Sequence, residues 1–242
     1  MKKTLFVLLL TSAMLFSQTN FSHAESLIND ILVLQPNVSQ QELMQDVKSI
    51  VSSTGKSEYH ILEQIYTELK ENEEQGQREK NKKSSEFTAT FGDTGGTVSV
   101  GSSTKGNFYY TPSETAYLDH GHVGMYYTST TIVESVPSAG VRTISTTARK
   151  VDSSGAMVKS VTTSTTNRNN AADWAYSQLG QSYSYNFATN RLTDHTGAKN
   201  CSKLIWSAYQ LYGNLDLDVD GGWGVYPRDI RDATNTMLVR NI

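Results

Sequence analysis

Cys201 is the only cysteine in the 242-residue chain, so it cannot form a disulfide within the protein. It directly follows Asn200, a residue type that caps helices, and the apolar pattern of residues 201–212 predicts a helix that starts at the cysteine. The free N–H groups and positive dipole end of a helix N-terminus stabilise a thiolate over a thiol. The same N–H groups can hold the oxyanion that forms when a thiolate attacks a carbonyl. Cys201 is therefore a candidate nucleophile, and the alternative is a small buried apolar side chain.

A thiolate nucleophile needs a base, usually an imidazole. The histidines beyond the first 24 residues are His60, His120, His122 and His195. His120 and His122 lie two residues apart at the entrance to a predicted strand, so both can point to one face. Either His120 or His122 can therefore supply the base, and we expect His195 to lie at the rim. Asp119 beside the two histidines raises the possibility of a metal site, but a third well-spaced ligand is missing, so we expect no metal and no cofactor.

Glu134 lies in the next predicted strand, within Thr131-Ile132-Val133-Glu134-Ser135. A short turn at residues 128–130 makes the two strands antiparallel neighbours and places Glu134 across from the region of His122. A carboxylate there can take the Nδ1 proton of the imidazole and fix its tautomer. Glu134 is therefore a candidate orienting residue, and the alternative is a half-exposed strand residue paired with a neighbour.

The elements that must position these residues change in character along the chain. From residue 86, apolar and polar residues alternate as in strands, and this pattern recurs to about residue 163. Helical patterns follow at residues 171–179 and 201–212. Strands followed by helices predict an α+β fold in which an antiparallel sheet packs with helices.

The chain is predicted to divide into four regions. Residues 1–24 read as a signal peptide, with two lysines, an apolar stretch and a small-x-small cleavage site. Residues 25–74 carry three helical apolar stripes and form a helical N-terminal region. Residues 75–85 are charged without an apolar face, which predicts a solvated linker. Residues 86–242 make up the main domain.

The predicted export places the protein outside the cell or in association with the cell wall, without a stable membrane span after the signal is removed. Removal of residues 1–24 takes away two lysines and no acid, which changes the formal charge from −3 to −5. A protein with this charge and no sizeable basic patch in its main domain is not expected to bind nucleic acid.

Several segments occur in an order that matches a known family. They are Gly106-Asn107-Phe108, His122-Val123-Gly124-Met125-Tyr126 followed by Ile132-Val133-Glu134-Ser135, Gly140-Val141-Arg142, Gly180-Gln181-Ser182-Tyr183-Ser184-Tyr185-Asn186-Phe187, Cys201-Ser202-Lys203-Leu204-Ile205-Trp206-Ser207-Ala208-Tyr209, and Val225-Tyr226-Pro227-Arg228-Asp229-Ile230. The arrangement resembles the circularly permuted papain-like cysteine hydrolases of the NlpC-type clan, in their YiiX/YebB-like branch. In that branch the histidine strand precedes the cysteine helix, and here the resemblance covers about residues 105–235.

The resemblance implies a permuted papain-like fold, with Cys201 as nucleophile, His122 as base and Glu134 as orienting residue. It also implies that Tyr183 lies near the oxyanion or substrate pocket, and the alternative is a core aromatic residue. The chain departs from the family pattern at three positions, with Asn107 for an aspartate, Asn200 for an aromatic residue and Lys203 for a glutamate.

The implied reaction is acyl transfer through a thioester. For an exported protein, the leading substrate is an amide in a peptidoglycan-derived peptide or another small peptide. Lipid acyl hydrolysis or acyl transfer on the same scaffold is one alternative, because relatives of the lecithin:retinol acyltransferase type also place an asparagine before the cysteine. A non-catalytic module that binds peptides or amino acids is the other. A wide apolar cleft would indicate lipid, and a narrow polar cleft would indicate peptide.

Overall fold

The computed structural model describes residues 23–82, 96–112, 119–193 and 195–242. The predicted signal peptide therefore lies almost entirely outside the described residues, as does the strand predicted at residues 87–91. Within the described ranges, no helix combines the length and the apolar character needed to cross a membrane.

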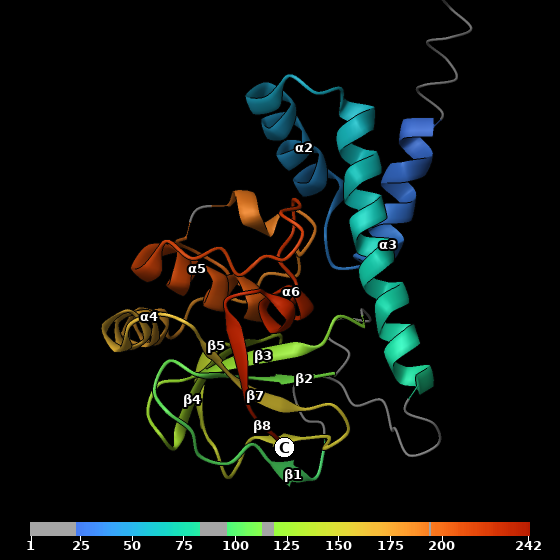
Figure 1. Cartoon of the computed structure of the whole chain (residues 1–242). Coiled ribbons are helices and arrows are strands. Elements are labelled where there is room, and N and C mark those ends of the chain that lie inside the picture. Colours follow the sequence, from blue (N-terminus) through green and yellow to red (C-terminus); the bar gives the residue numbers. More distant parts are fainter. Residues whose placement is uncertain (1–22, 83–95, 113–118, 194) are drawn as a thin grey trace, which may run out of the picture.

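An antiparallel sheet forms the centre of the main domain (Figure 1). Among the described residues it has six strands in the order β5-β4-β3-β2-β7-β8, and β1 pairs separately with β6. The strands are β1 (Val98–Ser99), β2 (Phe108–Thr111), β3 (His122–Tyr126), β4 (Thr131–Val136), β5 (Gly140–Ser145), β6 (Lys150–Val151), β7 (Met157–Val161) and β8 (Thr236–Asn241). Together with the helices described below, this confirms the predicted α+β fold with an antiparallel sheet.

Helices α4 (Thr165–Ser177), α5 (Cys201–Gly213) and α6 (Pro227–Asp232) lie on one side of the sheet (Figure 1). Both longer helices begin after a capping side chain, because Ser164 accepts a hydrogen bond from the third residue of α4 and Asn200 does the same for α5. α5 ends at Asn214, whose φ of 49° is the left-handed conformation that stops helices. α5 packs against α4, β3 and β4.

Side chains along each strand alternate between two cores, as the pleat of a sheet requires. Phe108, Tyr110, Val123, Met125 and Val133 belong to the core shared with α5. On the opposite face, a smaller core contains Val100, Tyr109, Tyr126, Ile132, Val151 and Val158. β1 and β6 cover this smaller core, since Val151 of β6 and Val100, next to β1, lie within it.

The N-terminal region consists of helical residues 23–34 followed by α2 (Gln40–Thr54) and α3 (Glu58–Lys82). Its buried side chains, among them Ile31, Leu43, Val47, Ile61 and Ile65, belong to the same apolar cluster as the core of the main domain. The N-terminal helices are therefore packed as part of one continuous hydrophobic core.

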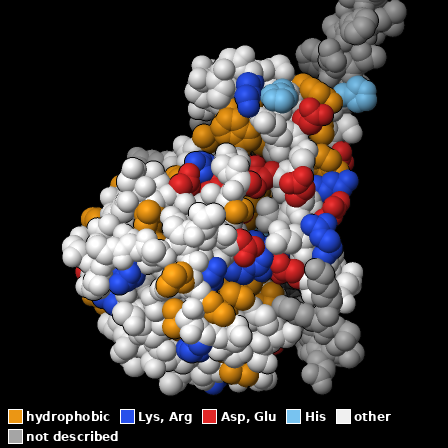
Figure 2. Space-filling view, in the orientation of Figure 1, with side chains coloured by type: hydrophobic (Ala, Val, Ile, Leu, Met, Phe, Trp, Pro, Cys, Tyr) orange, Lys and Arg blue, Asp and Glu red, His pale blue; other side chains and the backbone are white. Residues whose placement is uncertain are grey.

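The linker prediction for residues 75–85 is wrong where the structure describes them, because α3 continues to Lys82; residues 83–85 lie outside the described ranges. Tertiary ion pairs explain the difference. Glu79 accepts two hydrogen bonds from Arg231, at 2.8 and 3.0 Å, and Lys80 Nζ lies 2.9 Å from an Asp119 carboxylate oxygen. Acidic and basic side chains are interspersed over the α3 side of the molecule (Figure 2). The charged C-terminal part of α3, which lacks the apolar stripe of its first turns, is thus held by its ionic contacts.

Candidate active site

Cys201 is the first residue of α5 and is fully buried. The Oδ1 atom of Asn200 accepts a hydrogen bond from the Lys203 backbone N–H at 2.9 Å and so caps the helix. Two buried asparagines hold this cap: Asn190 Nδ2 donates to Asn200 Oδ1 at 3.2 Å, and Asn200 Nδ2 donates to the Asn186 carbonyl at 3.1 Å. This network fixes the N-terminus of α5 and with it the position of the thiol.

His122 begins β3, and its ring interacts with both Glu134 and Cys201. Its Nε2 atom lies 3.0 Å from Glu134 Oε2, and the ring lies close enough to the Cys201 thiol for the two charges to interact, while Nδ1 has no hydrogen-bond partner among the described residues. Because Glu134 occupies Nε2, the nitrogen that remains for Cys201 is Nδ1. The structure thus brings together the three residues that the sequence analysis selected.

The predicted contact between Glu134 and the Nδ1 atom of His122 is wrong, since the carboxylate meets Nε2. The strand register explains this outcome. Met125 lies opposite Val133, which puts Glu134 two residues away from the position directly across from His122. The carboxylate therefore reaches the distal nitrogen of the ring and leaves the nitrogen nearer the backbone to the thiol.

The environment of His122 favours its protonated form. Burial alone would lower the pKa of His122, but the charge interaction with Cys201 and the hydrogen bond to Glu134 outweigh it. The pKa of His122 therefore lies above its usual value of 6.5. An imidazolium in this position is the natural counter-ion of a cysteine thiolate.

Gly124 makes room for the carboxylate of Glu134. It lies opposite Tyr109 in the β2–β3 pairing. A Cβ atom on Gly124 would lie 2.5 Å from the Tyr109 ring and 3.1 Å from Glu134 Cβ. Only glycine lets the tyrosine ring lie across β3 and bring its hydroxyl to the carboxylate.

Glu134 is fully buried and has cationic and phenolic partners besides His122. Arg142 donates to its Oε1 through Nε and Nη2, at 3.1 and 2.9 Å, and Arg149 Nε lies 3.1 Å from its Oε2. The Tyr109 hydroxyl donates to the same Oε2 and accepts from Arg149 Nε at 2.7 Å. Burial would raise the pKa of Glu134, but the charge of Arg149 and the bond with His122 hold it well below its usual range.

Tyr109, Arg142 and Arg149 were not among the predicted site residues. A signal for Arg142 existed in the sequence, because the tight turn after β4 pairs Glu134 with Arg142 in the β4–β5 ladder. Arg149 follows β5 in a loop, and no strand periodicity links that loop to Glu134. Its contact depends on the tertiary fold alone.

The other two histidines considered as site residues lie elsewhere. His120 is buried with its ring centroid 4.1 Å from that of Phe187, and burial lowers the pKa of His120 to about 3. It is thus a neutral core residue. His195 lies in the loop before α5, with Nδ1 3.0 Å from Ser207 Oγ and its ring 5.4 Å from that of Trp206.

Tyr183 is half-buried and packs edge-on against Tyr185, with ring centroids 5.0 Å apart. The preceding residue, Ser182, accepts a backbone hydrogen bond from Lys199 at 3.1 Å, which sets this segment beside the chain that enters Cys201. A role of Tyr183 in binding substrate stays a prediction.

A cavity of about 40 Å³ adjoins the N-terminus of α5. Its lining is mainly polar and includes Asn186, Asn190 and Asn200, the same residues that fix the cap of the helix. Cys201 and His122 do not line this cavity.

Comparison with known proteins agrees with this arrangement. A family model described as "Permuted papain-like amidase enzyme, YaeF/YiiX, C92 family" matches residues 106–219, which include Cys201, His122 and Glu134. A relative from Bacillus subtilis (strain 168), named "Uncharacterized protein YycO", is 41% identical over 235 residues, or 97% of this chain and 92% of the relative. No solved structure matches the chain. The family match, together with the relative that aligns with almost the whole chain, shows that this chain belongs to the YaeF/YiiX family of permuted papain-like amidases.

Proposed function

We propose that this protein is an exported cysteine amidase that cleaves an amide bond in cell-wall peptides or other small peptides. The observation that carries the proposal is that the His122 ring bonds Glu134, with Nε2 3.0 Å from the carboxylate, and lies close enough to Cys201 for their charges to interact. Membership in a family of papain-like amidases supports the reaction class. Cys201 acts as nucleophile, His122 as acid and base, and Glu134 as the orienting residue.

In the first half-reaction the Cys201 thiolate attacks the carbonyl carbon of the amide, so a C–S bond forms and the carbonyl oxygen becomes an oxyanion. The His122 imidazolium gives its Nδ1 proton to the amide nitrogen as the C–N bond breaks. The amine leaves, and a thioester remains. In the second half-reaction neutral His122 takes a proton from water as the water oxygen attacks the thioester. The C–S bond then breaks, which releases the acid and restores the thiolate beside the imidazolium.

The first turn of α5 offers donors for the oxyanion. The first N–H groups of a helix have no partner within the helix, and Asn200 occupies that of Lys203. The N–H groups of Cys201 and Ser202 point toward the N-terminal end of the helix, next to the sulfur. Fixed donors at this place stabilise the charge that develops on the carbonyl oxygen.

Glu134 holds the His122 ring by accepting the Nε2–H group, which presents Nδ1 to the thiol. Arg142 and Arg149 keep the carboxylate ionised, so it also favours the imidazolium. Tyr183 is proposed to line the substrate pocket on the side of the segment that precedes the Cys201 helix.

Two arguments favour a peptide amide as substrate. The predicted signal peptide directs the protein to the cell wall or the medium, where peptidoglycan-derived peptides occur. The net negative charge disfavours nucleic acids.

The test is to incubate the full chain with peptidoglycan-derived peptides and to follow the release of new amino groups, with Cys201→Ser as the matched control. Release by the wild type and none by the variant supports the proposal. Long-chain acyl esters are assayed in parallel, and turnover of these esters alone would make the protein an acyl hydrolase. Saturable peptide binding without turnover of either substrate would make it a binding module.

A further inference from the structure

The segment of residues 186–190 holds the cap of the Cys201 helix. The Asn186 carbonyl accepts a hydrogen bond from Asn200 Nδ2 at 3.1 Å, and Asn190 Nδ2 donates to Asn200 Oδ1 at 3.2 Å. The three asparagines are at most 4% exposed, so water does not readily replace these bonds. The position of the cap therefore follows the position of this segment.

Helix α2 fixes the same segment through Asp46. The Oδ2 atom of Asp46 accepts hydrogen bonds from Asn186 Nδ2 at 3.0 Å and from Thr189 Oγ1 at 2.5 Å. The two donors are also bonded to each other, because Asn186 Nδ2 lies 2.8 Å from Thr189 Oγ1. Glu42, one turn earlier on α2, lines the cavity of about 40 Å³ together with Asn200. The N-terminal helical region therefore reaches the surroundings of the cap directly.

The loop before α6 supports the Cys201 helix as well. The Val225 carbonyl accepts hydrogen bonds from Ser202 Oγ at 2.6 Å and from Asn190 Nδ2 at 2.9 Å. The Val225 backbone N–H in turn donates to Asn190 Oδ1 at 2.7 Å. Val225 is thus bonded both to the second residue of α5 and to the segment that holds the cap.

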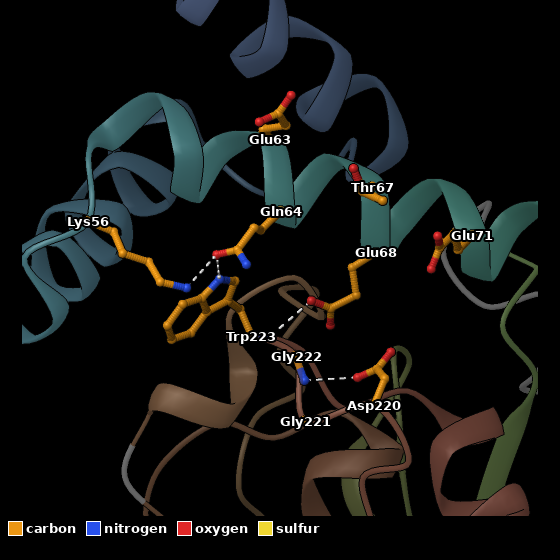
Figure 3. Close-up of a pocket in the computed structure, with 10 residues that line it drawn as sticks. All are labelled: Lys56, Glu63, Gln64, Thr67, Glu68, Glu71, Asp220, Gly221, Gly222 and Trp223. Atoms are coloured by element: carbon orange, nitrogen blue, oxygen red, sulfur yellow. Dashed lines mark hydrogen bonds between the residues drawn. The ribbon is translucent and has the colours of Figure 1, made fainter.

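Helix α3 fixes this loop through Glu68. Its Oε2 and Oε1 atoms accept the backbone N–H groups of Trp223 and Gly224, at 2.9 and 2.8 Å. Figure 3 shows Glu68 extending from α3 to the loop at Trp223. A Cβ atom on Gly222 would lie 2.4 Å from Glu68 Cδ, so the glycine leaves the room that the carboxylate occupies. Because Val225 directly follows Gly224, Glu68 determines where Val225 lies.

We propose that Asp46 and Glu68 are positioning residues for the amidase reaction, because they hold the two segments that fix the N-terminus of the Cys201 helix. The inference rests on the proposed role of Cys201 as nucleophile. The N–H groups and the dipole of that N-terminus stabilise the thiolate only while the sulfur keeps its place beside them. Both carboxylates precede residues 106–219, the segment that the family model matches. The N-terminal helices therefore contribute to catalysis through the position of the thiol.

The hydrogen bonds of the two carboxylates differ in a way that a conservative substitution can detect. Both bonds to Asp46 end on one oxygen, so the amide oxygen of an asparagine can accept both. Glu68 uses one oxygen for each backbone N–H, so a glutamine can accept only one and sets an NH₂ group against the other donor. Asp46→Asn should therefore preserve the thiolate, whereas Asp46→Ala and Glu68→Gln should destabilise it.

The test is the titration of Cys201 in the full chain, followed by the ultraviolet absorbance of the thiolate. Cys201 is the only cysteine, and Cys201→Ser supplies the background from tyrosine. We expect the wild-type midpoint to lie below the value of about 8.5 for a free cysteine. Asp46→Ala and Glu68→Gln should raise the midpoint toward that value and lower kcat about 10–100-fold with little change in KM. Asp46→Asn should restore both quantities.

Asp30→Ala and Glu71→Gln are the matched controls. Each removes one exposed acid from the same N-terminal helices, and Glu71 also lines the cavity beside Glu68, so both proteins should titrate as the wild type does. Circular dichroism and the melting temperature establish that each variant is folded. A lower melting temperature in Asp46→Ala and Glu68→Gln with the midpoint and kcat of the wild type would make both residues structural only and overturn the inference.

The titration needs no substrate, which separates this inference from the proposed function. A low wild-type midpoint that Asp46→Ala and Glu68→Gln both raise would support the inference even if no peptide were cleaved. A wild-type midpoint at or above about 8.5 would overturn the activated Cys201 thiolate, and the inference with it.

Discussion

Glu134 determines the electrostatics of the candidate active site. A fully buried carboxylate carries a large desolvation cost, and here Arg142, Arg149 and His122 offset it. The two arginines keep Glu134 ionised whatever the state of the histidine, so His122 is free to change its protonation during the reaction. The anion therefore orients the ring without itself taking up a proton.

Replacement of Cys201 by serine tests the nucleophile. The change exchanges a thiol for a hydroxyl of similar shape, so the fold should persist while turnover is lost. Amine release from the substrate peptide and circular dichroism of the variant measure the two effects. A Cys201→Ser protein with full activity would show that another group is the nucleophile.

Replacement of Glu134 by glutamine removes the charge and keeps the size of the side chain. It leaves Arg149 buried without its anion and destabilises the imidazolium of His122. We expect kcat to fall about 10²-fold or more, but less than in Cys201→Ala, and the stability to fall by about 3–5 kcal/mol. The pH–rate profile separates the two roles, because loss of the carboxylate should shift the limb that reports His122 to lower pH. Equal rates in variant and wild type would make Glu134 a structural residue.

At the scale of elements, the neighbouring strands β2, β3 and β4 bring the site together around Gly124. The tyrosine from β2 and the glutamate from β4 meet over the bare backbone of β3. α5 then brings its N-terminus to the start of β3, which joins the thiol to the histidine. The site thus depends on the absence of a side chain at Gly124 as much as on the catalytic groups.

Gly124→Ala should disturb the contact between Tyr109 and Glu134, because the added Cβ would lie 2.5 Å from the Tyr109 ring. We expect a loss of about 1–3 kcal/mol in the free energy of unfolding, measured with urea, and a lower kcat. Gly213→Ala is the matched control, since its Cβ would lie 3.1 Å from the flexible Leu215 side chain and 3.8 Å from Asn167 Nδ2, and both quantities should stay close to wild type. Equal stability of the two variants would mean that Tyr109 can move away from β3 without cost.

At the scale of the whole molecule, α3 joins the N-terminal helices to the main domain through ion pairs. Glu79 contacts Arg228 and Arg231, and Arg228 also donates to the Asp119 carboxylate at 3.2 Å. Gly76 permits this close approach, because a Cβ there would overlap Asp119. The docking of α3 is therefore sensitive to the charge of these groups.

Acid should weaken the docking of α3 on the main domain. Burial would raise the pKa of Glu79, but the hydrogen bond and charge of Arg231 lower it from 4.5 to about 2. A carboxylate whose pKa is lower in the folded state adds stability above pH 4.5, and this contribution is lost as the pH falls toward 2.

We therefore expect the urea stability of Glu79→Gln to change less than that of the wild type as the pH falls below 4.5. Glu74→Gln is the control, because Glu74 pairs with Arg78 on the exposed surface of the same helix and should behave as the wild type. An identical acid dependence in Glu79→Gln and wild type would show that the Glu79 ion pair does not stabilise the folded chain.

The sequence predicted those features that depend on local pattern. The cap at Asn200, the start of α5 at Cys201 and the antiparallel neighbours β3 and β4 all follow from residues close together in the chain. Which nitrogen of His122 meets Glu134 depends on the strand register, which places Glu134 two residues from the position opposite His122. The alternation of apolar and polar residues in the sequence does not fix this register.

Contacts between distant segments could not be predicted in the same way. Arg149 reaches Glu134 from a loop, and the charged end of α3 is stabilised by residues more than a hundred positions later. The edge strand β8 exposes Met237, Leu238 and Val239, so it lacks the buried alternating face that identifies most strands. In each case tertiary partners, absent from the local sequence, decide the structure.

The most direct measurement of the central claim is the pH titration of the His122 ring by NMR, in the wild type and in Cys201→Ala, with His122→Gln to assign the signal. The proposed pairing of Cys201 with His122 predicts that the pKa of His122 lies above 6.5 in the wild type and falls clearly when the thiol is removed. It also predicts that the Nε2 proton remains bonded to Glu134 in both proteins. An identical titration of His122 with and without the thiol would contradict the pairing of Cys201 with His122.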